Sequence, residues 1–414
     1  MGELLSVDFA RLQADLEALS EIGRSPTDQG LYRSAFSPEW LEAQQWFRAR
    51  IEAAGLDCHM DEAMNLHGRL NFDGQRPSVM CGSHLDSVPG GGVLDGALGV
   101  VAGLECLRRL RELGVETKYA LEVVSFSDEE GRFGGMFGSR AISGQLTPES
   151  IVEARDLSGV ALVDVLEELG VKPRHVLRAN RRPESIRCFV ELHIEQGPVL
   201  DQGGRNLGVV DGIVGLFKWE VRLRGQANHA GTTPMSMRLD AFQGLAEFAG
   251  ELNRILEEAG SETSVATIGR VALHPGAANV VPGRVSFTLE VRDMDPDVLL
   301  ELANAMRRAI SAIARRRRLM FEFDVLSEID PVKCDATVRD VIQSVAGAMN
   351  VDYSCLPSGA AHDAQMMADL TPVGMIFVPS KDGRSHSPAE WSSWESIEIG
   401  ANCLLNSLYR LAER

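Results

Sequence analysis

The chain has 414 residues, with 41 Lys and Arg against 59 Asp and Glu, so its formal net charge is −18. This length predicts two or three domains. The excess of acidic residues argues against binding of nucleic acid. No apolar stretch approaches the ~20 residues that a membrane-spanning helix needs. The amino terminus lacks the basic start of a secretory signal. Seven scattered cysteines without a CxxC pair predict reduced thiols and a cytoplasmic location.

In chain order, residues 37–54 carry apolar side chains at helical spacing and predict a helix that ends at Gly55. Short apolar runs predict buried strands at 79–81, 121–126, 189–194 and 375–378, with helices at 97–113 and 338–349. Buried strands that alternate with helices are typical of an α/β domain with a mixed, largely parallel sheet flanked by helices. Ligands of such sheets bind beyond the carboxyl ends of the strands, where polar residues follow each of these runs.

Residues 215–326 follow a different pattern. Strands are predicted at 217–223, 265–271, 285–291 and 320–325, with helices at 241–256 and 298–313. This β-α-β-β-α-β order is that of a small α+β domain. We therefore predict an insertion, with one domain formed by 1–212 and 329–414 and the inserted one by 213–328. The four arginines at 315–318 are interpreted as a solvated helix end; a nucleic-acid patch disagrees with the net charge.

Metal-ligand residue types follow the first two strands. His84 and Asp86 share one face of an extended segment, so Asp86 is placed to accept the second ring N–H of a metal-bound His84. Asp95 lies between glycines ahead of a helix, where a carboxylate can bridge two ions. The adjacent carboxylates of Glu129 and Glu130 repel each other unless a bound cation compensates their charge. A lone histidine at a strand end is more often structural, but the three elements together favour a metal site.

Other kinds of site are disfavoured. The sequence has no HExxH, no GxxxxGK[ST] and no GxSxG motif, although residues 383–387 are a near miss for the last. The three glycines at 90–92 lack the Lys and the helix start of a phosphate loop.

The chain resembles the dinuclear-zinc amidohydrolase family of aminoacylases and related carboxypeptidases in eight segments: GSHLDSV, GGVLDGALGV, SDEEG, ELHIEQGPVL, NHAGTTPM, NVVPG, GAAHDAQ and GRSHSPAEW. It is most similar to the branch of N-carbamoyl-L-amino acid hydrolases, β-ureidopropionases and allantoate amidohydrolases. The similarity extends from about Phe36 to Leu411. The family's fold, a zinc-binding α/β domain interrupted by a dimerisation or lid domain, agrees with the insertion predicted above.

The resemblance implies two divalent ions per subunit. Zn²⁺ is the expected ion, and Mn²⁺, Co²⁺ or Ni²⁺ are alternatives. In this arrangement, one ion would be held by His84 and His193, the other by Glu130 and His386, and Asp95 would bridge them. Glu129 would be the general base and Asp86 the partner of His84. His193 points to the ureido branch, because the aminoacylase and dipeptidase branches usually have Asp or Glu at this position.

The resemblance also implies the substrate contacts. Arg292 would grip the α-carboxylate with its planar fork; the alternative is a surface ion pair with Asp293 or Asp295. His229 would stabilise the oxyanion across a homodimer, and Asn279 would reach the substrate from the same domain. Gln196 would form a hydrogen bond with the ureido group. Gly359 and Ala360 would offer backbone contacts. His362 is expected to fix its loop by pairing with Asp363.

These implications predict a cytoplasmic, homodimeric enzyme that hydrolyses the linear C–N bond of N-carbamoyl-L-amino acids to the amino acid, CO₂ and ammonia. The alternatives are an allantoate amidohydrolase, a broader N-acyl-amino acid amidase and a catalytically silent binding protein. Two departures leave the substrate open: Ala361, where the family commonly has Gly, and a short stretch from Gly131 to Gly138.

Overall fold

The computed structural model describes residues 4–413, which form two compact units. The main unit consists of the chain up to Asp211 together with the chain from Lys333 onward, and the inserted unit is Gly212–Val332. These limits lie close to the predicted boundaries at 213 and 328. Between residues 4 and 413, no helix is long and apolar enough to cross a membrane.

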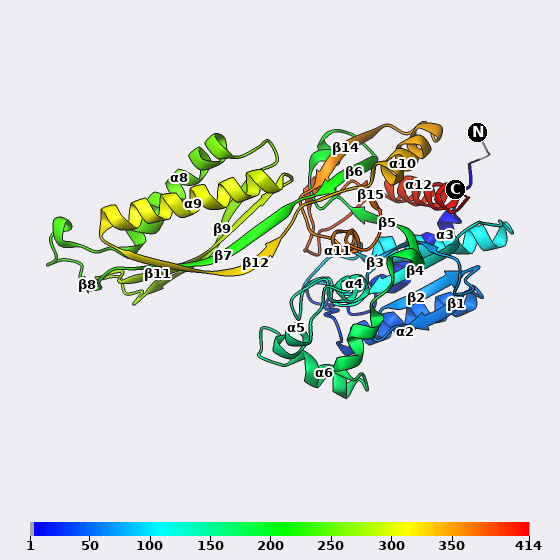
Figure 1. Cartoon of the computed structure of the whole chain (residues 1–414), viewed down its shortest axis with the longest axis horizontal. Helices are drawn as coiled ribbons and strands as arrows, with labels where there is room; N and C mark the ends of the chain where they lie inside the picture. Colours follow the sequence, from blue (N-terminus) through cyan, green and yellow to red (C-terminus); the bar gives the residue numbers. More distant parts are fainter. Residues whose placement is uncertain (1–3, 414) are drawn as a thin grey trace. The chain divides into compact units, whose positions relative to one another are not determined.

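The main unit is built on a nine-stranded sheet in the order β1-β2-β4-β3-β5-β15-β6-β13, with β14 paired to β6 (Figure 1). The strands are β1 (Asp57–Met60), β2 (Leu66–Leu70), β3 (Ser78–His84), β4 (Ala120–Phe126), β5 (Ile186–Ile194), β6 (Leu207–Ile213), β13 (Val332–Lys333), β14 (Tyr353–Ser358) and β15 (Val373–Val378). The central strands β4, β3, β5 and β15 are parallel, whereas β1, β2 and β6 pair antiparallel. The predicted α/β fold with a largely parallel sheet is confirmed.

Helices flank this sheet, and the three helices predicted for it are present. The helices are α1 (Phe9–Ser20), α2 (Pro38–Ala53), α3 (Ala97–Glu112), α4 (Phe137–Ser143), α5 (Pro148–Glu153), α6 (Leu162–Glu168), α7 (Val199–Gln202), α10 (Ala336–Ala348), α11 (Asp363–Met367) and α12 (Trp394–Glu413), with 3-10 turns η1 (Pro173–Ala179), η2 (Pro183–Ser185) and η4 (Lys381–Gly383). Every residue of β3, β4 and β15 is buried. Because helices cover both faces of a parallel sheet, these strands read as continuous apolar runs.

Strand β2, which lies between the edge strand β1 and β4, was not predicted, because its sequence LHGRL is polar although most of it is buried. Its polar side chains are compensated by one carboxylate of the neighbouring strand: Glu122 lies 2.9 Å from His67 Nδ1 and 2.9 Å from Arg69 Nε. The segment 137–185, with its short helices, was also not predicted. Its apolar residues pack with Phe36, Trp40, Met64 and Phe133 in a separate small core.

The inserted unit is a four-stranded antiparallel sheet in the order β12-β7-β11-β9, with helices α8 and α9 packed together on one face (Figure 1). Its elements are β7 (Gly215–Arg224), β8 (Asn228–His229), η3 (Met235–Met237), α8 (Ala241–Ala259), β9 (Val265–His274), β10 (Val280–Val281), β11 (Arg284–Asp293), α9 (Pro296–Arg317) and β12 (Met320–Ile329). Apolar residues alternate along β11 and form the core beneath the helices. The six main elements occur in the predicted order.

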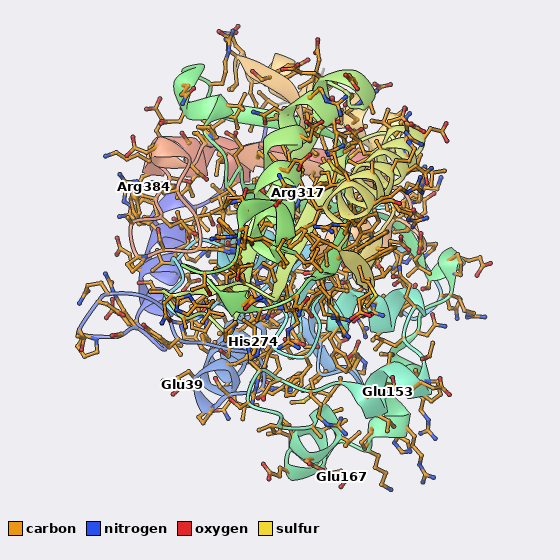
Figure 2. All side chains as sticks on the ribbon, turned by 90° about the vertical axis from the view of Figure 1, so that its left-hand side faces the viewer. Glu39, Glu153, Glu167, His274, Arg317 and Arg384 are labelled. Atoms are coloured by element: carbon orange, nitrogen blue, oxygen red, sulfur yellow. The ribbon has the colours of Figure 1, made fainter. Side chains whose placement is uncertain are left out.

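The arginine run lies at the end of α9, where Arg317 is labelled in Figure 2. Arg316 and Arg317 pair with Glu247 of α8, and Arg318 caps the helix in a left-handed conformation. The run therefore joins the two helices of the inserted unit.

Candidate metal centre

Five predicted ligands converge at the carboxyl edge of the four parallel strands. His84 ends β3, Glu130 follows β4, His193 is the penultimate residue of β5, and His386 follows β15. Asp95 lies in the loop that leads into α3. The sheet register aligns these strand ends, since His84 pairs with Phe126 of β4 and His193 with Phe377 of β15.

The ligand atoms form two groups that share Asp95: His84, Asp95 and His193, and Asp95, Glu130 and His386. Asp95 Oδ1 lies 3.1 Å from His193 Nε2 and 3.6 Å from His84 Nε2. His386 Nε2 lies 3.3 Å from Asp95 Oδ2 and 3.5 Å from Glu130 Oε2. Ligand atoms about 2.1 Å from a tetrahedral ion lie about 3.4 Å from one another. The distances therefore suit two ions bridged by Asp95.

The two buried imidazoles present Nε2 as a ligand. His84 Nδ1 donates to the Asp86 carbonyl at 3.0 Å, and His193 Nδ1 donates to the Ile194 carbonyl at 2.8 Å. The Gly96 N–H donates to His193 Nε2, so this nitrogen carries the lone pair. In both rings, a main-chain carbonyl thus holds the tautomer that a metal ion requires.

Asp86 contacts His84 differently from the prediction. Its carboxylate Oδ1 lies 3.8 Å from His84 Nδ1, beyond hydrogen-bond distance, because its own main-chain carbonyl takes the ring N–H. The other carboxylate oxygen, Oδ2, accepts the Glu130 N–H at 3.0 Å. The Asp86 side chain therefore fixes the segment that carries the paired glutamates.

The centre holds more buried negative charge than its histidines compensate. Burial raises the pKa of Glu129 well above its usual range; His84 opposes this shift and Glu130 adds to it. Burial and the Asp95 carboxylate raise the pKa of Glu130 to about 7. Glu130 Oε1 is buried without a hydrogen-bond partner within residues 4–413. Bound cations would neutralise this charge, as buried carboxylates require.

Glu129 lies beside the ligand groups. Its Oε2 is 3.4 Å from His84 Nε2, so it belongs geometrically to a further potential ligand group with His84 and Glu130. Its role as base stays a prediction, because these distances also suit a ligand.

Glu390 holds the loop that carries Asp95, and sequence reasoning missed it. It accepts the main-chain N–H groups of Leu94 and Asp95, each at 3.0 Å, and the Ser385 hydroxyl at 2.9 Å. Gly92 leaves room for this carboxylate, because a Cβ there would lie 2.1 Å from Glu390 Cδ. Its only signal in the sequence was its place in SPAEW, directly after His386.

Gln196 reaches the ligand groups from the loop after β5. Its Nε2 donates to Asp95 Oδ2 at 2.8 Å. Its Oε1 is buried and has no hydrogen-bond partner in the described part of the chain. This oxygen is an acceptor positioned next to the bridging carboxylate.

The loop that contains Gly359 and Ala360 is fixed by Ser358. The Ser358 hydroxyl accepts the Ala360 N–H at 3.2 Å and lies 2.8 Å from His362 Nε2. His362 therefore pairs with Ser358. The sequence had predicted the adjacent Asp363 as its partner. The His362 ring packs edge-on against that of His193, with the centroids 4.5 Å apart.

Arg292 lies at the end of β11 in the inserted unit. Its Nε and Nη2 both donate to Glu290 Oε1, at 2.9 and 2.7 Å, and Lys218 Nζ lies 2.6 Å from Glu290 Oε2. The alternative partners considered from the sequence were Asp293 and Asp295, whereas the structure pairs Arg292 with Glu290. The guanidinium is thus held in one orientation by a carboxylate that a lysine also contacts.

His229 and Asn279 are brought together, and Arg292 lies far from both. His229 of β8 pairs with Val280 of β10, and the Ala230 N–H donates to the Asn279 carbonyl at 2.9 Å. Along β7, Arg292 pairs with Leu216 at one end, whereas His229 follows Arg224 at the other end. The eight residue steps between Leu216 and Arg224 span about 27 Å.

Comparisons with known proteins show the family to which this chain belongs. The family described as Peptidase family M20/M25/M40 matches residues 80–410. The chain is 40% identical over 409 residues to an N-carbamoyl-L-amino acid amidohydrolase of Geobacillus stearothermophilus, covering 97% of this chain and 98% of that protein. It is 35% identical over 404 residues to an allantoate amidohydrolase of Escherichia coli (strain K12), covering 97% of each.

Among solved structures, an amidase of the hydantoinase/carbamoylase family from Burkholderia multivorans superposes with a TM-score of 0.89 at 33% identity, over 99% of both chains. The resemblance that the sequence motifs indicated is confirmed. This chain belongs to the M20/M25/M40 peptidase family.

Proposed function

We propose that this protein is a metal-dependent hydrolase that cleaves the linear C–N bond of N-carbamoyl-L-amino acids and releases the amino acid, CO₂ and ammonia. The observation that carries this proposal is the pair of ligand groups sharing Asp95, with Glu129 beside them. The full-length similarity to a carbamoyl amino acid amidohydrolase supports the type of reaction.

Two divalent ions fit the residues present. His84 and His193 would hold one ion, Glu130 and His386 the other, and Asp95 would bridge them. The imidazole and carboxylate set suits Zn²⁺, and also Mn²⁺, Co²⁺ or Ni²⁺. When bound, such ions polarise a carbonyl and lower the pKa of a water molecule.

Glu129 is the general base of the proposal. It takes a proton from the attacking water and delivers it to the departing amine, which requires a carboxylate close to the ions that does not itself bind them. Asp86 supports this role, because it holds the main-chain N–H of the adjacent Glu130.

Gln196 supports a ureido substrate over a simple amide. The buried and unpartnered Gln196 Oε1 is an acceptor beside the bridging carboxylate. A carbamoyl group ends in an NH₂ that can donate to this oxygen, whereas an acetyl group ends in a methyl that cannot. An N-acetyl substrate would leave the acceptor unsatisfied, and this difference is expected to favour carbamoyl compounds.

The separation of two predicted substrate contacts supports a dimer. Arg292 would bind the carboxylate and His229 the oxyanion. Leu216, which pairs with Arg292, and Arg224, which precedes His229 in the chain, lie about 27 Å apart along β7, far more than an N-carbamoyl amino acid spans. We therefore propose that each site combines Arg292 of one chain with His229 of the partner subunit, in a two-fold dimer.

The surface of the inserted unit supports association. Strand β9, whose last residue His274 is labelled in Figure 2, is an edge of the sheet. It exposes Val265, Val271 and Leu273. An exposed apolar edge strand is a template for pairing with another chain.

Allantoate is the second candidate substrate, because the relative from Escherichia coli carries that activity in its name. The test is a panel of N-carbamoyl, N-formyl and N-acetyl amino acids plus allantoate, assayed for amine and ammonia release with each of the four metals. The proposal predicts that carbamoyl amino acids react fastest. Faster release from allantoate would favour the second candidate, and equal rates with acetyl compounds would indicate a broad amidase.

A further inference from the structure

One ring nitrogen of His229 accepts hydrogen bonds from the main chain of the turn that follows it. Nδ1 accepts the main-chain N–H of Gly231 at 3.0 Å and that of Thr232 at 3.2 Å. A ring nitrogen that accepts two N–H groups cannot itself carry a hydrogen. The hydrogen of the neutral ring must therefore be on Nε2.

The opposite ring orientation does not fit these contacts. Turned by 180°, the ring would present Cδ2 to the same two N–H groups, and a ring carbon cannot accept them. The two donors would then lose the ring as their partner and would have only solvent as an acceptor. The turn thus selects both the orientation and the tautomer of His229.

Arg238 holds the two residues that flank this pair of donors. Its half-buried guanidinium donates to the Ala230 carbonyl at 2.5 Å and to the Thr233 carbonyl at 3.0 Å. The Thr233 hydroxyl in turn donates to the His229 carbonyl at 2.7 Å. Arg318 donates to the Ser236 carbonyl at 3.1 Å, further along the loop.

We propose that the Gly231–Thr232 turn fixes His229 as the Nε2–H tautomer, so that it serves as a hydrogen-bond donor and not as a base, and that Arg238 is the positioning residue for this turn. The catalytic part rests on the proposed function, in which His229 binds the developing oxyanion. A donor that is already oriented needs no rearrangement when charge develops on the substrate, which is how oxyanion sites act.

The tautomer is tested without turnover. Nitrogen NMR of the full-length protein, with ¹⁵N-labelled histidine and no metal added, is compared with that of His229→Gln to identify the His229 signals. The spectrum is recorded at alkaline pH, where imidazole rings are neutral. The expected spectrum has Nδ1 without a hydrogen and Nε2 with one. A hydrogen on Nδ1 would overturn the proposal, whatever the enzyme hydrolyses.

Arg238 is tested by Arg238→Gln and Arg238→Lys, with Arg318→Gln as the matched control. Arg238→Gln should shift the His229 signals toward a mixture of tautomers and lower kcat about tenfold with little change in KM, since a small displacement of a catalytic group is costly. Arg238→Lys should recover part of both effects, and Arg318→Gln should change neither. Unaltered His229 signals in Arg238→Gln would refute the positioning role.

The donor role is tested by His229→Gln and His229→Asn. The Gln amide reaches the place of Nε2 and can still donate, whereas the Asn amide reaches only the place of Nδ1, so Gln should retain more activity. Equal loss in both variants would contradict the donor role. Full activity in both, together with the expected NMR tautomer, would overturn the catalytic part and the proposed oxyanion contact while the tautomer stands.

Discussion

Arg292 and His229 belong to the same sheet of the inserted unit and lie at its opposite ends. Arg292 pairs with Leu216 at the start of β7, and His229 follows the end of the same strand. The strand between them keeps the two side chains apart, because a paired strand cannot fold back on itself. If both side chains contact one substrate, they must come from two chains. Catalysis would then require a dimer.

Glu129→Gln should retain both metal ions while turnover falls by about 10²–10⁴-fold, the usual contribution of general acid–base catalysis. The control is Glu130→Gln, which removes a ligand and should lose an ion. Metal content per chain, measured beside kcat, separates the two roles. Loss of an ion from the Glu129 variant would make that residue a ligand.

Arg292→Lys should raise KM roughly tenfold or more with unchanged metal content, because one ammonium cannot reproduce the paired contact of a guanidinium with a carboxylate. Arg222→Lys is the matched control, since Arg222 is also ion-paired on this sheet, with Glu322. Steady-state kinetics with a carbamoyl amino acid provides the measurement. An unchanged KM would show that Arg292 does not bind the carboxylate.

Glu390→Ala should weaken metal binding by about 10–100-fold, as loss of a group that supports a metal ligand usually does. The reason is that Leu94 and Asp95 lose the acceptor of their N–H groups. Gly92→Ala should act in the same direction, because its Cβ would displace the Glu390 side chain. Competition with a chelator gives the affinity; a wild-type value in both variants would remove Glu390 from this role.

Metal affinity should rise with pH across the neutral range. In the metal-free protein, burial and Asp95 raise the pKa of Glu130 to about 7, and a hydrogen bond to Asp95 raises the pKa of His386 to about 9 despite its burial. Below these values, both side chains carry protons that an ion must displace, so lowering the pH weakens binding. Titrations at about pH 6, 7 and 8 measure this dependence. Affinity that is independent of pH would contradict these shifts.

The strands that carry the ligands could be predicted from the sequence, because each is a continuous apolar run ending in polar residues. His84, Glu130, His193 and His386 follow four such runs. The alternating pattern of 285–291 likewise predicted β11 correctly. The antiparallel strand β2 could not be predicted, because its buried residues are polar and their partner, Glu122, lies on another strand.

Contacts between distant segments could not be predicted. The hydrogen bond from Asp95 to Glu390 joins residues 295 positions apart, and that from Gln196 to Asp95 joins residues 101 positions apart. Neither has a local pattern, because the sheet order alone brings their loops together. The pairing of Arg292 with Glu290 joins alternate residues of one strand, but several carboxylates nearby in the sequence were equally plausible partners.

The shared site is tested most directly by mixing two inactive variants, His229→Ala and Arg292→Ala, under conditions in which subunits demonstrably exchange. If each site takes Arg292 from one chain and His229 from the other, about half of the dimers become mixed and each contains one intact site. The mixture should then recover about a quarter of wild-type activity per chain. A mixture that exchanges subunits and stays as inactive as its parents would contradict the shared site.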